Sequence, residues 1–379
     1  MMKEYLRFTR RELHMYPEVR FELDRTCGFV KQELESIGLV ADESYGISSV
    51  TALLAVDKSF KTLGLRADMD ALDITEISDK EYKSRIEGKM HACGHDVHTA
   101  MLLGAAKALV ENKDKLKYNV RFIFQSSEEG PDSGAKHLVE DGIMDDVDMI
   151  FGMHVSNQMD TGTAGMCIGN AAASATRFSI EVTGKGGHAG TPHLAIDAIA
   201  MSARIINDIQ HLVAREMNPF NPLVVNVGTI SGGSISNGVA ENVNMTGTIR
   251  TFSKDTAEYL KNRIETIVKT VTESCGGTYK TVFNDGLPPV INEKGISMFF
   301  ADKIKAMIGD DKFIFIDEGM MGSEDFSYYL TKKPGSFIWL GTGSEEKNIR
   351  TAHHDPRFDI DEEAMMVGVE IFKNLAMQE

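Results

Sequence analysis

Strand-like and helix-like segments alternate along the first part of the chain, and this alternation limits the fold more than any other feature of the sequence. Apolar, β-branched runs typical of strands occupy residues 48–56, 62–67, 119–125 and 148–155. Helical spacing is found over residues 97–111 and 134–141, and over 3–37, where Pro17 interrupts the helix and Gly38 ends it. Strands that alternate with helices predict an α/β fold built on one sheet.

The pattern changes near Ser174 and returns to its earlier form after Pro288. Between these points the expected order is strand, helix, strand, strand, helix, strand, over residues 178–182, 194–215, 223–230, 242–252, 257–274 and 278–283. This order fits a compact α+β unit of ferredoxin-like type. The Gly-rich stretch 228–234 lacks the residues of a nucleotide-binding loop and is interpreted as an ordinary loop. Alternation then resumes with a helix at 295–308, a strand at 336–340 and a helix at 361–376.

The simplest domain organisation is one α/β domain interrupted by an insertion. We expect residues 1–175 and 289–379 to form a mixed sheet with helices on both faces, and residues 176–288 to form the inserted α+β domain. A chain of 379 residues also favours two domains over one.

Three polar clusters fall where strands are expected to end. They are Asp68 with Asp70, Glu128 with Glu129, and His154. Binding and catalytic sites in open α/β sheets form at the carboxyl ends of strands. We therefore expect these clusters to contribute to one site.

The densest group of metal-binding side chains lies between Met90 and His98. Cys93 and His95 are separated by Gly94, whose backbone freedom allows both side chains to face one point from a tight turn. Asp96 is interpreted as the N-cap of the following helix. A thiolate and an imidazole are good ligands for zinc and similar ions. A buried thiol beside solvated histidines is the alternative interpretation of this stretch.

The adjacent carboxylates Glu128 and Glu129 suit a hydrolytic metal centre. Neighbouring side chains on an extended segment point to opposite sides, so that one can bind a metal while the other faces water. A structural zinc site has no use for the second carboxylate. Taken alone, the pair is more typical of a solvated loop, and the other clusters at strand ends are what favour the metal centre.

Composition and charge exclude several classes of partner. Hydrophobic residues make up 42% of the chain and charged residues 25%, which is typical of a globular protein. The formal net charge of −16 argues against nucleic acid and against membranes as partners. The residues from Met1 to Arg7 show no signal-peptide pattern, and the four cysteines form no Cys-x-x-Cys pair. We expect a cytoplasmic protein with free thiols.

Nearly the whole chain resembles the family of dinuclear metal-dependent aminoacylases and carboxypeptidases. Within that family it is most similar to the amidohydrolase branch of hippurate hydrolase, bacterial N-acyl-amino-acid hydrolases, N-acetyldiaminopimelate deacetylase and plant auxin-conjugate hydrolases. The motifs that carry the resemblance occur in the family's order at residues 10–18, 65–72, 90–98, 124–130, 152–155, 186–189, 247–251, 322–326 and 353–358.

The resemblance implies a ligand set for two divalent metal ions, either zinc or manganese, with cobalt or nickel as further choices. Cys93 would bridge the ions, and the other ligands would be His95, Glu129, His154 and one of the pair His353–His354. Aligning on Pro356 and Phe358 favours His354 over His353. His14 and Asp70 would orient the ligands, and His91 and His98 would lie outside the ligand set.

The resemblance also implies the remaining roles in the site. Glu128 would be the general base. His188 of the inserted domain would reach an active site, often that of a partner subunit. Arg250 and Asn242 would bind the substrate carboxylate. The implied activity is hydrolysis of N-acyl amino acids by a homodimer whose inserted domain acts as a lid and dimerisation unit.

Two departures from the family pattern put the identity of the substrate in question. Ser126–Ser127 stands where the branch commonly has Pro-Ala, and residues 237–242 differ from its usual Asn-Val-Ile-Pro pattern. Two other functions therefore stay open. One is a dipeptidase or carboxypeptidase on the same scaffold, and the other is a non-catalytic metal-binding protein, in which Glu128 would have no role.

Overall fold

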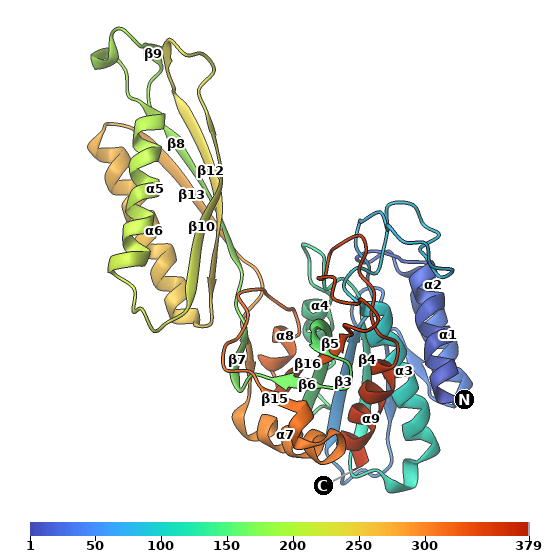
Figure 1. The fold of residues 1–379 in the computed structure, drawn as a ribbon. Helices are drawn as coiled ribbons and strands as arrows, with labels where there is room; N and C mark the ends of the chain where they lie inside the picture. The colour runs from blue at the N-terminus through green and yellow to red at the C-terminus, as the bar shows by residue number, and fades with distance from the viewer. Residues whose placement is uncertain (378–379) are drawn as a thin grey trace. The chain divides into compact units, whose positions relative to one another are not determined.

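The computed structural model describes residues 1–377 and divides the chain into two compact units (Figure 1). Unit 1 contains Met1–Ala171, Ile291–Glu318 and the residues from Asp325 onward. Unit 2 contains Ala172–Val290 and the short segment Gly319–Glu324. The sequence predicted that the insertion would be a single segment, residues 176–288. The segment Gly319–Glu324, which also belongs to unit 2, was not expected.

Unit 1 is an α/β structure built on one mixed sheet of eight strands. Their order across the sheet is β1-β2-β4-β3-β5-β16-β6-β15. The strands are β1 (Ala41–Asp42), β2 (Val50–Leu54), β3 (Thr62–Asp68), β4 (Asn119–Gln125), β5 (Met149–Asp160), β6 (Ala164–Met166), β15 (Phe313–Phe315) and β16 (Gly335–Gly343). Two short strands, β7 (Gly169–Ala172) and β14 (Val290–Asn292), pair separately. The central pairs β4–β3, β3–β5 and β5–β16 are parallel, whereas β2–β4 and β16–β6 are antiparallel.

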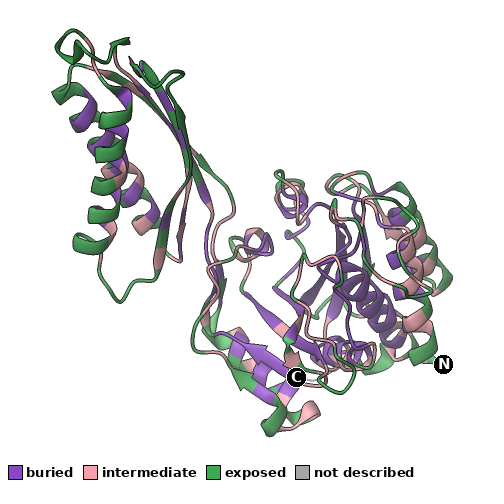
Figure 2. Ribbon diagram, turned by 45° about the horizontal axis from the view of Figure 1, so that its top comes forward, coloured by how far each residue is buried: buried purple, intermediate pink, exposed green. Residues whose placement is uncertain are grey.

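Helices cover both faces of this sheet, which confirms the fold expected from the sequence. They are α1 (Met2–Met15), α2 (Asp24–Ser36), α3 (His95–Glu111), α4 (Gly134–Glu140), α7 (Lys294–Ile308), α8 (Ser327–Leu330) and α9 (Ala364–Met377). On β3, Leu63, Leu65 and Ala67 join the apolar core shared with α3 and α9. Arg66 points to the opposite face, where it contacts Asp325 just before α8. All seven residues of β3 are buried, as expected for a central parallel strand (Figure 2).

Gly94, rather than Asp96, stands at the N-cap of α3, so the N-cap expected at Asp96 is wrong. The helix begins at His95, and Gly94 has a φ of +86°. A Cβ atom at this position would lie 2.5 Å from Cγ2 of Val155, which leaves room for glycine only. The Asp96 side chain instead accepts hydrogen bonds from Arg10 and contacts His14.

Two further boundaries differ from the sequence-based expectation. Strand β5 continues to Asp160, so His154 lies within the strand and not at its end. It is paired there with Trp339 of β16. In unit 2 the Gly-rich stretch was expected to be a loop, but β10 extends through it to Gly232, with an irregularity of register between Val227 and Thr229.

Unit 2 has the strand–helix–strand–strand–helix–strand order expected from the sequence. Its elements are β8 (Thr176–Thr183), α5 (Ala198–Arg215), β10 (Leu223–Gly232), β12 (Asn242–Thr251), α6 (Lys254–Ser274) and β13 (Thr278–Asp285). The sheet order is β10-β12-β8-β13, with all pairs antiparallel. Phe178, Ile180 and Val182 of β8 alternate with exposed residues and pack against the two helices. The other face of this sheet is largely exposed (Figure 2).

A small ribbon joins two loops of unit 2. Strand β9 (Gly187–His188) pairs antiparallel with β11 (Gly238–Val239). Among residues 1–377, no helix combines the length and the apolar character needed to cross a bilayer.

Candidate metal centre

The turn before α3 brings Cys93 and His95 together with His154 of β5. The thiol and the two imidazoles lie within 4.8 Å of one another, and all three residues are buried. The Sγ atom of Cys93 lies 3.3 Å from Nε2 of His154. Nδ1 of His154 donates to the carbonyl of Val155 at 2.8 Å, which leaves Nε2 as the free lone pair that faces Cys93.

Glu129 and His354 extend this group on the side of Cys93. Ligand atoms of Cys93, Glu129 and His354 also lie within 4.8 Å of one another, and Nε2 of His354 is 2.9 Å from Oε1 of Glu129. His354 has a φ of +66°, and its backbone N–H donates to Ala92 at 2.8 Å. This left-handed backbone turns the imidazole toward the cluster.

His353 packs differently from its neighbour. Its ring lies edge-on to His154, with 4.9 Å between centroids, and tilted against Phe358 at 5.2 Å. Among the described residues, the groups with metal-binding geometry include His354 and do not include His353. The choice of His354 as a ligand agrees with this geometry and stays a prediction.

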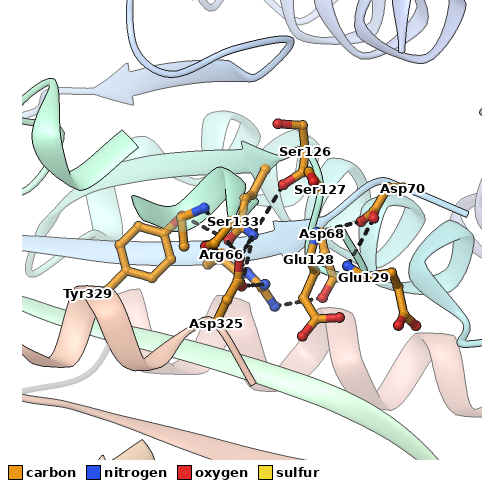
Figure 3. A network of polar contacts seen from close by, with 12 residues as sticks. Arg66, Asp68, Asp70, Ser126, Ser127, Glu128, Glu129, Ser133, Asp325 and Tyr329 are labelled. Atoms are coloured by element: carbon orange, nitrogen blue, oxygen red, sulfur yellow. Dashed lines mark hydrogen bonds and ion pairs between the residues drawn. The ribbon is translucent and has the colours of Figure 1, made fainter. Parts of the chain in front are cut away.

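Asp70 holds the two adjacent glutamates by their backbones (Figure 3). The N–H of Glu128 donates to Oδ1 of Asp70 at 3.0 Å, and the N–H of Glu129 donates to Oδ2 at 3.1 Å. Oδ1 of Asp70 also lies 3.3 Å from Nδ1 of His95. The Asp70 carboxylate thus fixes the backbone of Glu128 and Glu129, in the loop between β4 and α4 (the glutamate loop), relative to His95. The carboxylates of Glu128 and Glu129 come within 4.8 Å of the His95 ring.

The donor set fits a divalent cation. Nε2 of His95 is buried and makes no hydrogen bond among the described residues, whereas Nδ1 faces Asp70. Burial of such a group without a partner costs about 1–3 kcal/mol, and a metal ion would provide the missing partner. Sulfur, imidazole nitrogen and carboxylate oxygen together suit zinc and neighbouring transition metals.

The electrostatics of the cluster point the same way. Burial alone would lower the pKa of His95, but Asp68, Asp70 and Glu129 raise it to about 10. Burial and the nearby glutamates raise the pKa of the Cys93 thiol. The carboxylates that contribute to both shifts place negative charge around the cluster, which a bound cation would neutralise.

His98 is fixed by two hydrogen bonds, and it also belongs to a group with metal-binding geometry, together with Asp68 and His95. Its place outside the ligand set stays a prediction. Its Nε2 accepts from the N–H of Val155 at 3.0 Å, so Nδ1 carries the proton and donates to Asp68 at 2.6 Å. Nδ1 of His14 lies 2.8 Å from Oδ2 of Asp96, the residue that follows His95 in the sequence. His91 is buried and has no hydrogen-bond partner among the described residues.

Several side chains near this site received no role from the sequence. Trp339, the one tryptophan of the chain, lies with its ring centroid 5.3 Å from that of His154. Arg66 is fully buried and pairs with Asp68 and Asp325. A buried arginine inside an apolar strand was the one signal in the sequence for this pairing, but the pattern did not identify its partners.

The three site residues expected from the inserted domain lie in unit 2. His188 is exposed on β9, and its Nδ1 accepts from the N–H of Gly190 at 2.9 Å. Asn242 begins β12, and its side-chain oxygen accepts from the hydroxyl of Thr183 at 3.0 Å. Arg250 is partly buried and donates to the hydroxyl of Ser323 at 3.0 Å. Their roles toward a substrate stay predictions.

Comparison with known proteins gives a consistent family. The model of peptidase family M20/M25/M40 matches residues 64–378. Thermostable carboxypeptidase 1 of Saccharolobus solfataricus is 36% identical over 95% of this chain and 91% of its own length. The IAA-amino acid hydrolase ILR1-like 4 of Arabidopsis thaliana is 36% identical over 97% of this chain and 84% of its own length. The N-acetyl-L-cysteine deacetylase of Bacillus subtilis is 36% identical over 94% and 84%.

A solved structure extends the comparison to three dimensions. The YXEP protein of Bacillus subtilis, described as a dinuclear metal-binding peptidase of the M20 family, covers 99% of this chain with a TM-score of 0.87 and 31% identity. The alignment includes 98% of that protein. Because the family model and these relatives agree over nearly the full chain, the protein belongs to peptidase family M20/M25/M40 and is a metal-dependent hydrolase of amide bonds.

Proposed function

We propose that this hydrolase cleaves the amide bond of N-acyl amino acids and releases a carboxylic acid and a free amino acid. The observation that carries the proposal is the close grouping of His95, Glu128 and Glu129 beside a second group formed by Cys93 and His154. The relatives named as an N-acetyl-L-cysteine deacetylase and an IAA-amino acid hydrolase support this substrate class.

The proposed metal ligands are five side chains that belong to three overlapping groups with metal-binding geometry. Cys93 would bind both of two divalent ions, and the remaining ligands are His95, Glu129, His154 and His354. The dinuclear character of the related Bacillus subtilis structure supports two ions. Zinc or manganese suits the donor set best, and cobalt or nickel is also compatible with it. When bound, such ions polarise a carbonyl and lower the pKa of water to about 7.

Glu128 is the proposed proton carrier. Its backbone N–H donates to Asp70, and its carboxylate would take a proton from the attacking water. The same carboxylate then returns this proton to the departing amine. His188 would stabilise the oxyanion by donating a hydrogen bond, and Arg250 with Asn242 would bind the substrate carboxylate.

A homodimer is part of the proposal, because His188 would serve the active site of a partner subunit. The inserted domain would provide both the dimer contact and the closing movement over the substrate. The four cysteines are free thiols, which supports a reducing, cytoplasmic location.

The competing function is a carboxypeptidase or dipeptidase, which the name of the Saccharolobus solfataricus relative favours. Both functions use the same amide chemistry and differ in the group on the acyl side. A peptide substrate carries a free α-amino group there, whereas an N-acyl amino acid carries none.

A substrate panel separates the two functions. Protein stripped with chelator and reloaded with zinc or manganese is assayed for release of free amino acid. The panel contains N-acetyl, N-benzoyl and N-indoleacetyl amino acids, N-acetyldiaminopimelate and dipeptides. Metal-dependent turnover of the acylated substrates would support the proposal, and turnover of dipeptides alone would establish the peptidase. No turnover of any substrate, with metal bound, would favour a non-catalytic metal-binding protein.

A further inference from the structure

The loop that carries Glu128 and Glu129 has no regular secondary structure of its own. It runs from the end of β4 at Gln125 to the start of α4 at Gly134. Inside it, Ser127 has a φ of +47° and donates from Oγ to the carbonyl of Asp132 at 2.7 Å. A general base must be held within a few tenths of an ångström of its working position, so the ends of this loop have to be fixed by other residues.

Asp325 contacts both ends of the loop (Figure 3). At the first end, Nε2 of Gln125 donates to its two carboxylate oxygens at 2.9 and 2.8 Å. At the second end, the hydroxyl of Ser133 donates to Oδ2 at 2.6 Å, and the N–H of Ala135 donates to the same oxygen at 3.3 Å. Asp325 has no exposed surface, so water does not compete for these bonds.

Arg66 completes the network and links it to the metal cluster. Its Nη2 donates to Oδ1 of Asp325 at 2.9 Å, and its Nη1 donates to Asp68 at 2.6 Å. Its Nε donates to the side-chain oxygen of Gln125 at 2.8 Å, and this oxygen also accepts from the hydroxyl of Tyr329 at 2.9 Å. The buried carboxylate of Asp325 is thus paired in charge and surrounded by donors.

We propose that Asp325 is a positioning residue for Glu128 and Glu129. It holds the two ends of the loop at one carboxylate, while Asp70 holds the backbone between them. The loop then presents the general base and the neighbouring ligand in a fixed place before substrate arrives. This inference rests on the proposed roles of Glu128 and Glu129.

Replacement of Asp325 by Asn tests this role with almost no change of shape. The groups that hydrogen-bond to the carboxylate all donate to it, so the amide NH₂ of Asn would face a donor in either orientation. Asn292→Asp is a matched control. Asn292 is buried in unit 1, where it donates to the carbonyls of Cys167 and Phe337, and none of its hydrogen bonds goes to residues 126–133.

The first measurement is amide hydrogen exchange in the metal-free protein, which is independent of the reaction. We expect Asp325→Asn to speed exchange of the amides in 126–135 by about tenfold or more, while α9 keeps its protection. Asn292→Asp should leave exchange in 126–135 unchanged. If Asp325→Asn leaves this segment as protected as in the wild type, or if the control exposes it equally, the positioning role is wrong.

The second measurement is steady-state turnover with metal restored. Loss of a residue that orients a reacting group costs about 10- to 100-fold in activity. We expect that loss in kcat, with KM within about twofold of the wild type, because the substrate-binding residues are untouched. If exchange in 126–135 is faster but kcat is unchanged, the role assigned to Glu128 is wrong. If exchange in 126–135 is as slow as in the wild type, the role assigned to Asp325 is wrong.

A milder pair of variants keeps the test valid if Asp325→Asn does not fold. Ser133→Ala removes one contact at the second end of the loop, and Tyr329→Phe removes one donor to Gln125 at the first end. Each should speed exchange in 126–135 by a smaller factor, and the double variant by more than either. No increase in the folded double variant would overturn the proposal.

Discussion

Arg10 of α1 connects three parts of unit 1 that are far apart in the sequence. Its side chain is 1% exposed. Nε donates to Asp96 at 2.9 Å, Nη2 to Asp359 at 2.6 Å and Nη1 to Glu362 at 3.3 Å. The first partner follows His95, and the other two follow the segment that carries His354. Replacement by Met keeps much of the side-chain volume and removes the charge.

The cost of Arg10→Met is worked out from what each carboxylate retains. Asp359 and Glu362 keep other partners, namely Lys80, Tyr82, Arg7 and Arg11. Asp96 is 1% exposed and, among the described residues, keeps the ion pair with His14. Loss of one partner of a buried ion pair costs about 3–5 kcal/mol. We therefore expect unit 1 to lose about that much stability at pH 7.

Urea unfolding followed by Trp339 fluorescence measures this loss. Trp339 is the single tryptophan and lies in unit 1, so its signal reports that unit without assuming that both units unfold together. The control is Lys31→Met, which removes an ion pair between two exposed side chains and should cost less than about 1 kcal/mol. A loss below about 1 kcal/mol for Arg10→Met would refute the reasoning.

Two further predictions concern the same unit. Gly94→Ala should destabilise it by about 1–3 kcal/mol in the urea assay, because the new methyl group meets Val155 and the φ of +86° is unfavourable. Wild-type stability in that variant would contradict this. Burial would raise the pKa of Glu362, but Arg11 and Arg10 hold it below its ordinary value. A lowered pKa contributes stability that is present above about pH 4.3 and is lost as the pH falls further. Glu362→Gln should therefore have a lower free energy of unfolding than the wild type at pH 7, and the two values should converge below pH 4. A difference in free energy of unfolding that stays constant over this range would contradict the prediction.

The sequence was sufficient for five strands of the sheet in unit 1 (β2, β3, β4, β5 and β16) and for the topology of unit 2, but it did not predict the short strands β1, β6 and β15. Strand β4 contains Phe122, Ile123 and Phe124 in succession and β8 alternates strictly, so both are recognisable as strands from the residue types alone. The grouping of Cys93, His95, Glu129 and His154 was expected from the family resemblance, and the structure places these side chains in overlapping groups, although His154 lies within β5 and not at its end.

The remaining errors arose where tertiary contacts decide the local structure. Asp96 is a residue type that often caps helices, but here it is the second residue of α3. Its side chain accepts a hydrogen bond from the buried Arg10 instead of capping the helix. The Gly-rich stretch of β10 remains a strand because β12 pairs with it along most of its length. The pairing of Arg66 with Asp325 joins residues 259 positions apart, and no local pattern reports such a contact.

The central claim is that a metal cluster and the carboxylate of Glu128 together hydrolyse an amide. The most direct test compares the wild type with Glu128→Gln after chelation and reloading, by metal content and by turnover of an N-acyl amino acid. Two ions per chain are expected in both proteins, with turnover of the variant lower by about 10²- to 10⁴-fold. Full turnover by Glu128→Gln, or full turnover by the metal-free wild type, would contradict the account.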